Sequence, residues 1–365
     1  MVGYMKRVLM VTAFPPNEKT AGQDYTRRLI LDMLSKNYNV DLIYAYYPGH
    51  EIELPKEVNV LRVINPSISN CLKKWYVHPF FTKRYERKIK NYIQNIASNY
   101  DMLYFDFSQV HLYAKYIEHP YKILMCHDVI CQKYARKTCK LNVEWTKKCE
   151  REVFKCAKTI FTFSNKDKKI IKDEYKIDAM PVNFYLKSEK FTYRNETLNH
   201  YMCFYGAWNR KENLESLQYF IKMVYPKLKN QRLFSIIGGG MPRKMVKNLE
   251  RMGIDYLGFI DDPIKYLASC QALIVPLHQG AGVKVKVIDA LTTGTPVIGT
   301  AIAFEGIEDN KNYNLFHQAE KDEQFVKIID EWINIGTDFK QKAADEFYNR
   351  YNCNHFPEVI ERLQG

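Results

Sequence analysis

The sequence has no apolar run of the roughly 18 residues that a membrane-spanning helix needs, and it has no closely paired cysteines. Its nine cysteines are odd in number and scattered, and no Cys-x-x-Cys occurs. Zinc ligands usually come in closely spaced pairs, so no metal site is expected. The cysteines are interpreted as reduced thiols of a cytosolic protein. The apolar run near the N-terminus lacks the features of a signal peptide and is interpreted as a buried strand.

The charge of the chain is unevenly distributed. The net charge is +13, and residues 1–182 contain 31 of the 54 basic residues but 19 of the 41 acidic ones. Two stretches, 72–90 and 133–158, concentrate this excess and mix it with aromatic residues. Such a face attracts anionic lipid head groups, a phosphorylated acceptor or nucleic acid, and a solvated helix surface is the alternative.

Strand-like and helix-like segments alternate along the chain. RVLMVTAF (7–14) is a continuous apolar run, which is typical of a strand buried on both faces of a parallel sheet. The pattern weakens near 178–200, which is interpreted as a linker, and then restarts. We therefore predict an α/β protein with two doubly wound, Rossmann-like domains, at 1–182 and 183–345. Their ligands are expected at the carboxyl ends of the strands and in a cleft between the domains.

One glycine-rich stretch, HQGAGVKVKVIDALTTGTPVIG (278–299), follows the strand-like run ALIVPL. A helix that begins near Val283 offers free N–H groups and the positive end of its dipole to a phosphate. Gly280 and Gly282 let the phosphate approach the backbone closely. Asp289 lies about 9 Å further along the helix axis, which suits the ribose of the same nucleotide. A glycine-rich turn with an exposed acid is the alternative interpretation.

The order of the motifs resembles the group 1 glycosyltransferases, a retaining family with the GT-B fold. Their signature is Pro-Leu, G-x-G-x-[RK]-x-K, two apolar residues, Glu-Ala, G-x-P-V-[IV] and Glu-Gly, and this chain has PL, GAGVKVK, VI, DA, GTPVIG and EG within 276–306. The family's glycine segments are also matched by FYGAWNRKENLESLQYF (204–220) and SIIGGG (235–240). The close match covers 201–310, and the first half matches in outline. The resemblance implies two domains that face a central cleft, with 346–365 returning to the first as a helix.

The resemblance also implies donor contacts around the glycine-rich stretch. Asp289 stands where the family has a ribose-binding Glu, with a side chain one methylene shorter. Ala281 stands where many members have a Glu near the donor sugar, and the backbone amides of 281–283 are expected to replace that side chain. Lys284 is the better candidate for the phosphate, whereas Lys286 is expected to face the sheet or to pair with acids.

Two further donor contacts are implied outside that stretch. Arg210 and Lys211 resemble the basic loop that neutralises the diphosphate, with a solvated position as the alternative for either. Phe259 and Ile260 fall where the family's backbone meets the base, and core packing is the alternative for their side chains.

In the first half, the resemblance points to the ends of two strand-like runs. Gly22 resembles the glycine loop that faces the donor phosphates. His127 resembles the family's histidine that contacts the transferred sugar. Asp128 can orient His127, accept from the acceptor hydroxyl or cap the next segment. Asp106 also ends a strand-like run, and a structural role is favoured for it.

Taken as a whole, the resemblance implies transfer of a sugar from a nucleotide diphosphate to an acceptor hydroxyl, with retention. Basic side chains stabilise the leaving diphosphate, and the sequence has no Asp-x-Asp triplet, so metal-independent turnover without a cofactor is expected. A lipid-linked or cell-surface glycan is the expected acceptor, and a cytoplasmic or peripheral position on the inner face of the plasma membrane is expected. The alternatives are a nucleotide-sugar epimerase of the same fold and a non-catalytic protein that binds anionic lipid or nucleic acid. An RNA-binding signature is lacking, so nucleic acid is not an expected partner.

Overall fold

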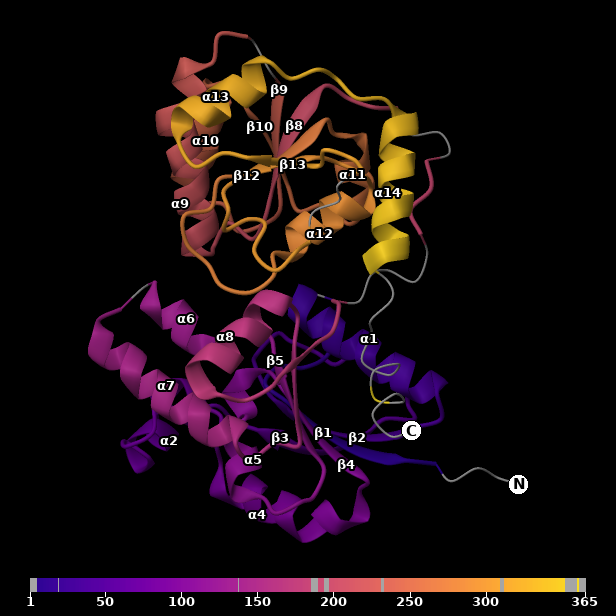
Figure 1. Cartoon of the computed structure of the whole chain (residues 1–365), viewed down its shortest axis with the longest axis vertical. Helices are drawn as coiled ribbons and strands as arrows, with labels where there is room; N and C mark the ends of the chain where they lie inside the picture. Colours follow the sequence, from indigo (N-terminus) through magenta and orange to yellow (C-terminus); the bar gives the residue numbers. More distant parts are fainter. Residues whose placement is uncertain are drawn as a thin grey trace. The chain divides into compact units, whose positions relative to one another are not determined.

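The computed structural model of the protein describes residues 5–18, 20–136, 138–184, 190–193, 197–230, 233–308, 312–351 and 360. These residues form two compact units, one with the residues up to 184 and Ile360, the other with residues 190–351. Each unit is a parallel sheet covered by helices (Figure 1), which confirms the predicted α/β class with two Rossmann-like parts. Within the described ranges, no helix is both long enough and apolar enough to cross a membrane.

The sheet of the first unit has the strand order β3-β2-β1-β4-β5-β6-β7, and all its pairs are parallel. The strands are β1 (Arg7–Thr12), β2 (Asn39–Ala45), β3 (Asn59–Ile64), β4 (Met102–Asp106), β5 (Lys122–Cys126), β6 (Thr159–Thr162) and β7 (Met180–Pro181). The helices are α1 (Ala21–Ser35), α2 (Ile68–Lys73), α3 (Pro79–Thr82), α4 (Arg87–Ile96), α5 (Leu112–Tyr116), α6 (Ile130–Ala135), α7 (Lys140–Phe154) and α8 (Asn165–Tyr175).

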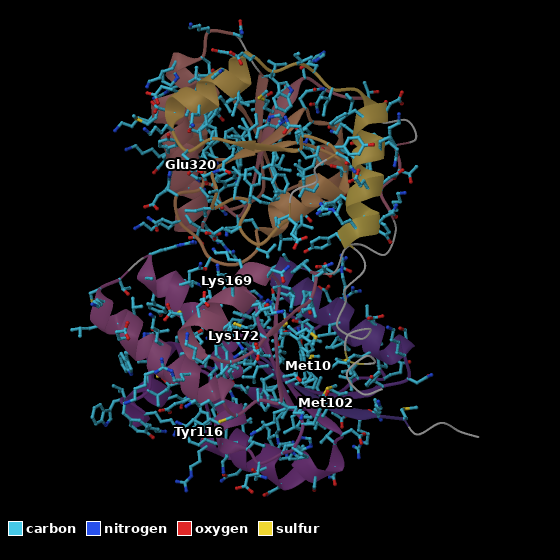
Figure 2. All side chains as sticks on the ribbon, viewed as in Figure 1. Met10, Met102, Tyr116, Lys169, Lys172 and Glu320 are labelled. Carbon is cyan, nitrogen blue, oxygen red and sulfur yellow. The ribbon has the colours of Figure 1, made fainter. Side chains whose placement is uncertain are left out.

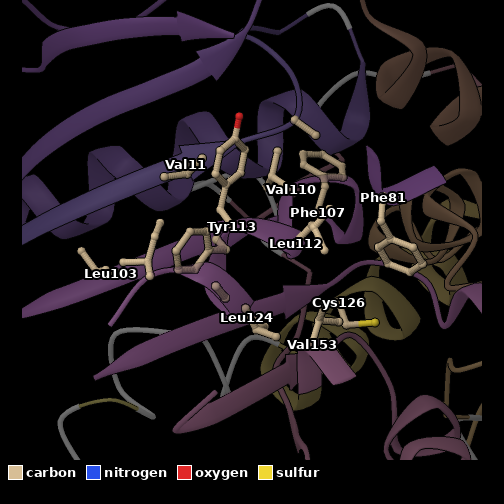
Figure 3. Packing of buried hydrophobic residues seen from close by; sticks show 14 of the residues in the cluster. Val11, Phe81, Leu103, Phe107, Val110, Leu112, Tyr113, Leu124, Cys126 and Val153 are labelled. Carbon is tan, nitrogen blue, oxygen red and sulfur yellow. The ribbon is translucent and has the colours of Figure 1, made fainter. Parts of the chain in front are cut away.

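Burial of apolar side chains on both faces of the central strands holds this sheet together. After its first residue, every residue of β1 is buried, as the continuous apolar run predicts. Met10 and Met102 lie on the adjacent strands β1 and β4 (Figure 2). Figure 3 shows the packing of Val11, Leu103 and Leu124 with residues of the covering helices, among them Leu112. The core of the first unit therefore lies along the sheet, with the strand ends at its edge.

The sheet of the second unit has the order β10-β9-β8-β11-β12-β13, again all parallel. The strands are β8 (Tyr201–Tyr205), β9 (Leu233–Ile237), β10 (Asp255–Gly258), β11 (Ala272–Val275), β12 (Val297–Gly299) and β13 (Phe316–Gln318). The helices are α9 (Lys211–Tyr219), α10 (Arg243–Arg251), α11 (Pro263–Ser269), α12 (Val285–Thr292), α13 (Asp322–Asp330) and α14 (Thr337–Tyr351).

Three details differ from the sequence expectations. The helix-like segment 212–229 is not one continuous α-helix, because α9 is followed by a π-helical turn and then a 3₁₀ turn that contains Pro226, which has no N–H to donate. β13 and the short helices α2 and α3 had no clear local signal. The segment 346–365, expected to return to the first unit, begins inside α14 of the second unit. Ile360 belongs to the first unit, as expected, and the other residues after 351 lie outside the described ranges.

Parallel strands present their carboxyl ends along one edge of each sheet, which is where the candidate residues gather. In the first unit, Thr12 pairs with Asp106, and Asp106 pairs with Met125. The residues that follow β1, β4 and β5 therefore start from neighbouring positions. In the second unit β8 lies between β9 and β11, so the loops after these three strands share the same edge.

Candidate functional site

The glycine-rich stretch of the second unit folds as a loop between β11 and α12. Gly280 and Gly282 have φ angles of +145° and +67°, in the region that favours glycine. α12 begins at Val285, two residues later than predicted, because the backbone of Lys284 is still extended. Asp289 therefore lies about 6 Å along the axis from the helix start, one turn in, and not the expected two.

The ammonium of Lys284 ties this loop together. It donates hydrogen bonds to Gly282 O at 2.6 Å and Ala281 O at 3.4 Å, and it lies 3.8 Å from a carboxylate oxygen of Glu305. A Cβ at Gly280 would lie 3.1 Å from the Cε of this lysine. The contacts of Lys284 thus stabilise a loop conformation that requires glycine at 280 and 282. Its contact with a phosphate stays a prediction.

Lys286, two residues further, is held by the first turn of α9, the helix that follows β8. Its Nζ donates a hydrogen bond of 2.8 Å to Asn213 Oδ1, and Asn213 Nδ2 donates to Ala207 O at 2.9 Å. A Cβ at Gly206 would lie 2.9 Å from Asn213 Nδ2 and 3.3 Å from Lys286 Nζ, so glycine makes room for both side chains. This contact joins the start of α9 to the start of α12, with an amide in the place of the expected acid.

Positive charge is concentrated around Lys286. Burial, and then the charges of Lys284 and Arg210, lower the pKa of Lys286 to about 7, and the charge of Glu212 opposes this shift. The N–H of Val287 donates to Lys284 O at 2.8 Å, so Val285 and Lys286 carry the N–H groups that remain at the helix start, where the positive end of its dipole lies. A diphosphate at this position would favour the charged form of the lysine.

The structure separates the two basic residues of the loop after β8. Arg210 is the N-cap residue of α9, and its charge reaches Lys286. Lys211 is exposed and lies 3.5 Å from Glu215, one turn along α9. Arg210 therefore belongs with Lys284 and Lys286 to a group of positive charges that we call the cation cluster. Lys211 is solvated, and its contact with a diphosphate stays a prediction.

Glycines hold the loops after β8 and β9 against each other. Gly238 has a φ of +106°, and a Cβ there would lie 2.0 Å from Gly206 O. The backbone N–H of Trp208 donates to Gly239 O at 2.9 Å, and the buried indole N–H donates to the backbone of β9 at 3.0 Å. The loop that carries Arg210 is therefore fixed at the carboxyl edge of the sheet.

Asp289 lies beside the carboxyl end of β8. Burial, and then the charge of Asp289, raise the pKa of Tyr205, the last residue of that strand. Tyr205 is not among the predicted site residues, and its position at the end of a strand is the one signal for it in the sequence. Phe259, just after β10, is 78% exposed, so core packing is wrong for this side chain, while Ile260 is half-buried.

In the first unit, Asp106 is the residue that orients His127. The Oδ1 of the fully buried Asp106 lies 2.8 Å from His127 Nε2. Its other oxygen accepts hydrogen bonds from the hydroxyls of Thr12 and Thr26. Asp106 therefore has more than the structural role that was favoured for it, because it orients His127. Orienting this histidine was one of the alternatives for Asp128, and the structure gives that contact to Asp106. A carboxylate accepts hydrogen bonds, so Nε2 carries the hydrogen and Nδ1 of the neutral ring is an acceptor.

Phe107 and Gly22 enclose the same imidazole. The φ of Phe107 is +67°, which is strained for a bulky residue, and its ring stacks on that of His127 with centroids 3.6 Å apart. Gly22 lies in the first turn of α1 and not in the expected loop. A Cβ there would lie 3.1 Å from the phenyl ring and 3.9 Å from His127 Nδ1. Nδ1 therefore faces the start of α1.

Comparisons with known proteins agree with this architecture. Residues 199–334 match the family model described as Glycosyl transferases group 1. None of the curated proteins matches the sequence. Three similar solved structures are TarM of S. aureus (TM-score 0.74, 11% identity, covering 99% of this chain and 98% of that one); WaaG, a glycosyltransferase involved in lipopolysaccharide biosynthesis (0.65, 13%, 95% of each chain); and Anabaena HepE in complex with UDP (0.64, 11%, 99% and 100%).

The identities to the solved structures are low, so these structures establish the fold. The family model covers the segments after β8 and β11 that carry the cation cluster, and the loop after β9 that packs against the first of them. The chain has the fold of the GT-B glycosyltransferases, and its residues 199–334 match the group 1 glycosyltransferase family.

Proposed function

We propose that the protein is a retaining glycosyltransferase that moves a sugar from a nucleotide-diphosphate donor to an acceptor hydroxyl. The observation that carries the proposal is the cation cluster at the start of α12. There Lys286 is hydrogen-bonded to Asn213, and the charge of Arg210 helps to lower its pKa. Like charges that are held together at a helix start are stabilised by an anion, and a diphosphate is such an anion. The nucleoside attached to it would extend along the same helix toward Asp289.

The reaction follows from where charge develops. When the bond from the anomeric carbon to the diphosphate breaks, negative charge grows on the leaving phosphate. Lys286, Arg210 and the N–H groups of the first turn of α12 stabilise that charge. Asp289 accepts hydrogen bonds from the ribose hydroxyls, and the exposed ring of Phe259 offers a face to the base. Protein cations meet the charge requirement, so metal-independent turnover is part of the proposal.

In the first unit, His127 contacts the transferred sugar. Its Nε2 is held by Asp106, so Nδ1 is the atom that accepts from a sugar hydroxyl. The acceptor proton leaves with the departing phosphate, and no side chain of this chain is assigned as a base.

Similar structures support the choice of substrates to test first. HepE has been solved with UDP and with UDP-glucose, and TarM with UDP and alpha-GlcNAc-glycerol. UDP-sugars are therefore the first donors to test. The lipopolysaccharide role of WaaG and the basic first half of this chain support a lipid-linked or cell-surface glycan as the acceptor. They also support a peripheral position on the inner face of the plasma membrane.

Donor hydrolysis tests the proposal. Wild type, Asp289→Asn and Lys286→Gln are incubated with UDP-, GDP-, ADP- and dTDP-sugars without added metal, and the released nucleoside diphosphate is measured. Lys244→Gln, an exposed lysine on α10, is the matched control. Wild type and control are expected to release the nucleoside diphosphate from one of the four kinds of donor. The two site variants are expected to release little or none of it. Release that survives in both site variants would remove the cation cluster from the mechanism.

A further inference from the structure

The short helix α2 and the turn after it expose apolar side chains on one side. Ile68, Leu72 and Trp75 follow each other at helical spacing, and all three are exposed, Trp75 by 77%. Tyr76 is exposed as well, and α2 buries none of its own residues. A stripe with this spacing normally faces the core of a protein. We call these four side chains the α2 surface.

The backbone beneath the α2 surface is well anchored, so the exposure is built into the fold. The Ser67 hydroxyl caps α2 by accepting from Ser69 N–H at 3.1 Å, and Ser67 N–H donates to Lys83 O at 2.9 Å. The ammonium of Lys74 lies over the rings of Tyr116, labelled in Figure 2, and Tyr85, at 4.3 Å and 4.8 Å from their centroids. Lys74 therefore fixes the turn from which Trp75 and Tyr76 project.

The fold brings the two basic stretches of the first unit together at this surface. The indole N–H of Trp145 on α7 donates to Tyr76 O at 3.3 Å. His78 Nε2 lies 3.0 Å from Asn142 Oδ1, also on α7. Leu141, next to Asn142, is 84% exposed. These contacts join the segment that follows α2 to α7.

Positive charge surrounds the exposed apolar groups. Lys73 lies within the stripe, Lys83 anchors the start of α2, and Lys140 begins α7, and all three are exposed. The exposed acid nearby, Glu144, lies 3.7 Å from Lys147. Lysine is depleted at the centre of protein–protein interfaces, whereas lysine among aromatic and aliphatic side chains is typical of segments that lie in a membrane interface.

We propose that the α2 surface docks on an anionic lipid bilayer. Leu72 and Ile68 enter the boundary between head groups and acyl chains, Trp75 and Tyr76 lie at head-group depth, and Lys73 and Lys140 contact anionic head groups. The inference deepens the proposed function, since it gives the face through which a lipid-linked acceptor is reached and so rests on that function for its purpose. Its test measures binding alone and does not depend on turnover.

Tryptophan fluorescence tests the docking directly. Trp208 and Trp332 are buried and Trp145 is half-buried. The exposed Trp75 should therefore give most of the change in emission on docking, with a smaller part from Trp145, whose indole contacts Tyr76. Vesicles of phosphatidylcholine with phosphatidylglycerol should shift the emission to the blue, and brominated lipid should quench it. Vesicles of phosphatidylcholine alone should do neither at 0.1 M salt. Trp75→Phe should remove most of the shift and of the quenching while the protein still sediments with the anionic vesicles.

Matched variants measure the contributions to binding. Leu72→Ala should lower the partition coefficient between water and vesicles roughly tenfold, because it removes aliphatic carbons that docking would bury in the bilayer. Lys73→Gln should lower it about fivefold, and only at low salt. Ile333→Ala, an exposed apolar residue of the second unit, should leave it unchanged. All three change exposed side chains, and circular dichroism checks their folding.

Three outcomes would overturn the docking surface. Wild type that does not bind anionic vesicles is the first, and binding without quenching of Trp75 is the second. The third is self-association in wild type that Leu72→Ala removes while vesicles have no effect, which would make the surface an interface between copies. Donor hydrolysis of the same samples is followed in parallel. Its loss with docking intact would count against the proposed function alone.

Discussion

Lys286 should make nucleotide binding depend on pH. Its pKa in the unliganded protein is about 7, so above that pH most molecules carry a neutral amine. A bound diphosphate favours the ammonium and raises the pKa toward its ordinary value, about 10.4. Binding above pH 7 must therefore take up a proton, and the affinity must fall as the pH rises.

The size of the effect follows from the two pKa values. If the ligand restores the ordinary pKa of the lysine, Kd rises about tenfold for each pH unit well above 7, and roughly fiftyfold between pH 7 and pH 9. Proton uptake is then close to one per nucleotide at pH 8. A smaller pKa shift gives a smaller effect, so fiftyfold is the upper bound. The second phosphate ionisation of the ligand, near pH 6, is nearly complete over this range and contributes little.

Isothermal titration calorimetry measures both quantities. UDP, or the nucleoside diphosphate that the hydrolysis panel identifies, is titrated at pH 7, 8 and 9 in two buffers that differ in ionisation enthalpy. Lys286→Gln should bind more weakly at pH 7 and show no uptake of a proton at pH 8. Lys244→Gln should behave as wild type. A wild-type Kd that is constant from pH 7 to pH 9, or an equal slope in Lys286→Gln, would refute the reasoning.

Three other residues give independent tests. Asp106→Asn should lower the kcat of donor hydrolysis roughly a hundredfold, because the amide no longer fixes the ring of His127; a change confined to KM would contradict this. Glu150→Gln should lower the free energy of unfolding in urea by about 1–3 kcal/mol at pH 7, because the buried carboxylate accepts from two N–H groups of α6 and from a tyrosine hydroxyl. Burial raises the pKa of Glu150 to about 6, so the folded protein binds a proton there more tightly than the unfolded chain does. Wild type therefore gains about 1 kcal/mol of stability between pH 7 and pH 5, and the difference from Glu150→Gln should widen at pH 5; a difference that narrows would refute the assignment. Gly238→Ala should lower Tm far more than Gly239→Ala, because its Cβ would meet a backbone oxygen at 2.0 Å whereas residue 239 faces open space, and equal shifts would contradict this packing.

Local chemistry explains why much of the fold could be predicted. A buried parallel strand must be apolar along its whole length, and RVLMVTAF shows this in the sequence alone. Gly280 and Gly282 have positive φ angles that few other residues adopt. The glycines in the sequence therefore predict the loop before α12 as well. The helix start was less accessible, since the extended backbone of Lys284 depends on its contacts with Ala281, Gly282 and Glu305.

The difference of two residues in the helix start also changes which lysine lies in the first turn of α12. Residues two apart on a helix point about 200° away from each other, so the position of the first turn decides which lysine faces the loop after β8. With a start at Val283, Lys284 would lie in the first turn. With the observed start at Val285, Lys284 remains in the loop and Lys286 takes that position, where it reaches Asn213. Helix phase, which a sequence pattern gives only approximately, thus determines the predicted chemistry.

Strand order determines which residues far apart in the sequence meet at the site. Asp106 and His127 are 21 residues apart and meet because β4 and β5 are neighbours in register. Taken alone, a carboxylate at a strand end has no identifiable partner, which is why a structural role was favoured for it. The basic stretches 72–90 and 133–158 pose the same problem, since each resembles a solvated helix face until the contact between Trp145 and Tyr76 joins them. A residue whose function depends on a distant partner becomes recognisable only when the strand order that brings the two together is known.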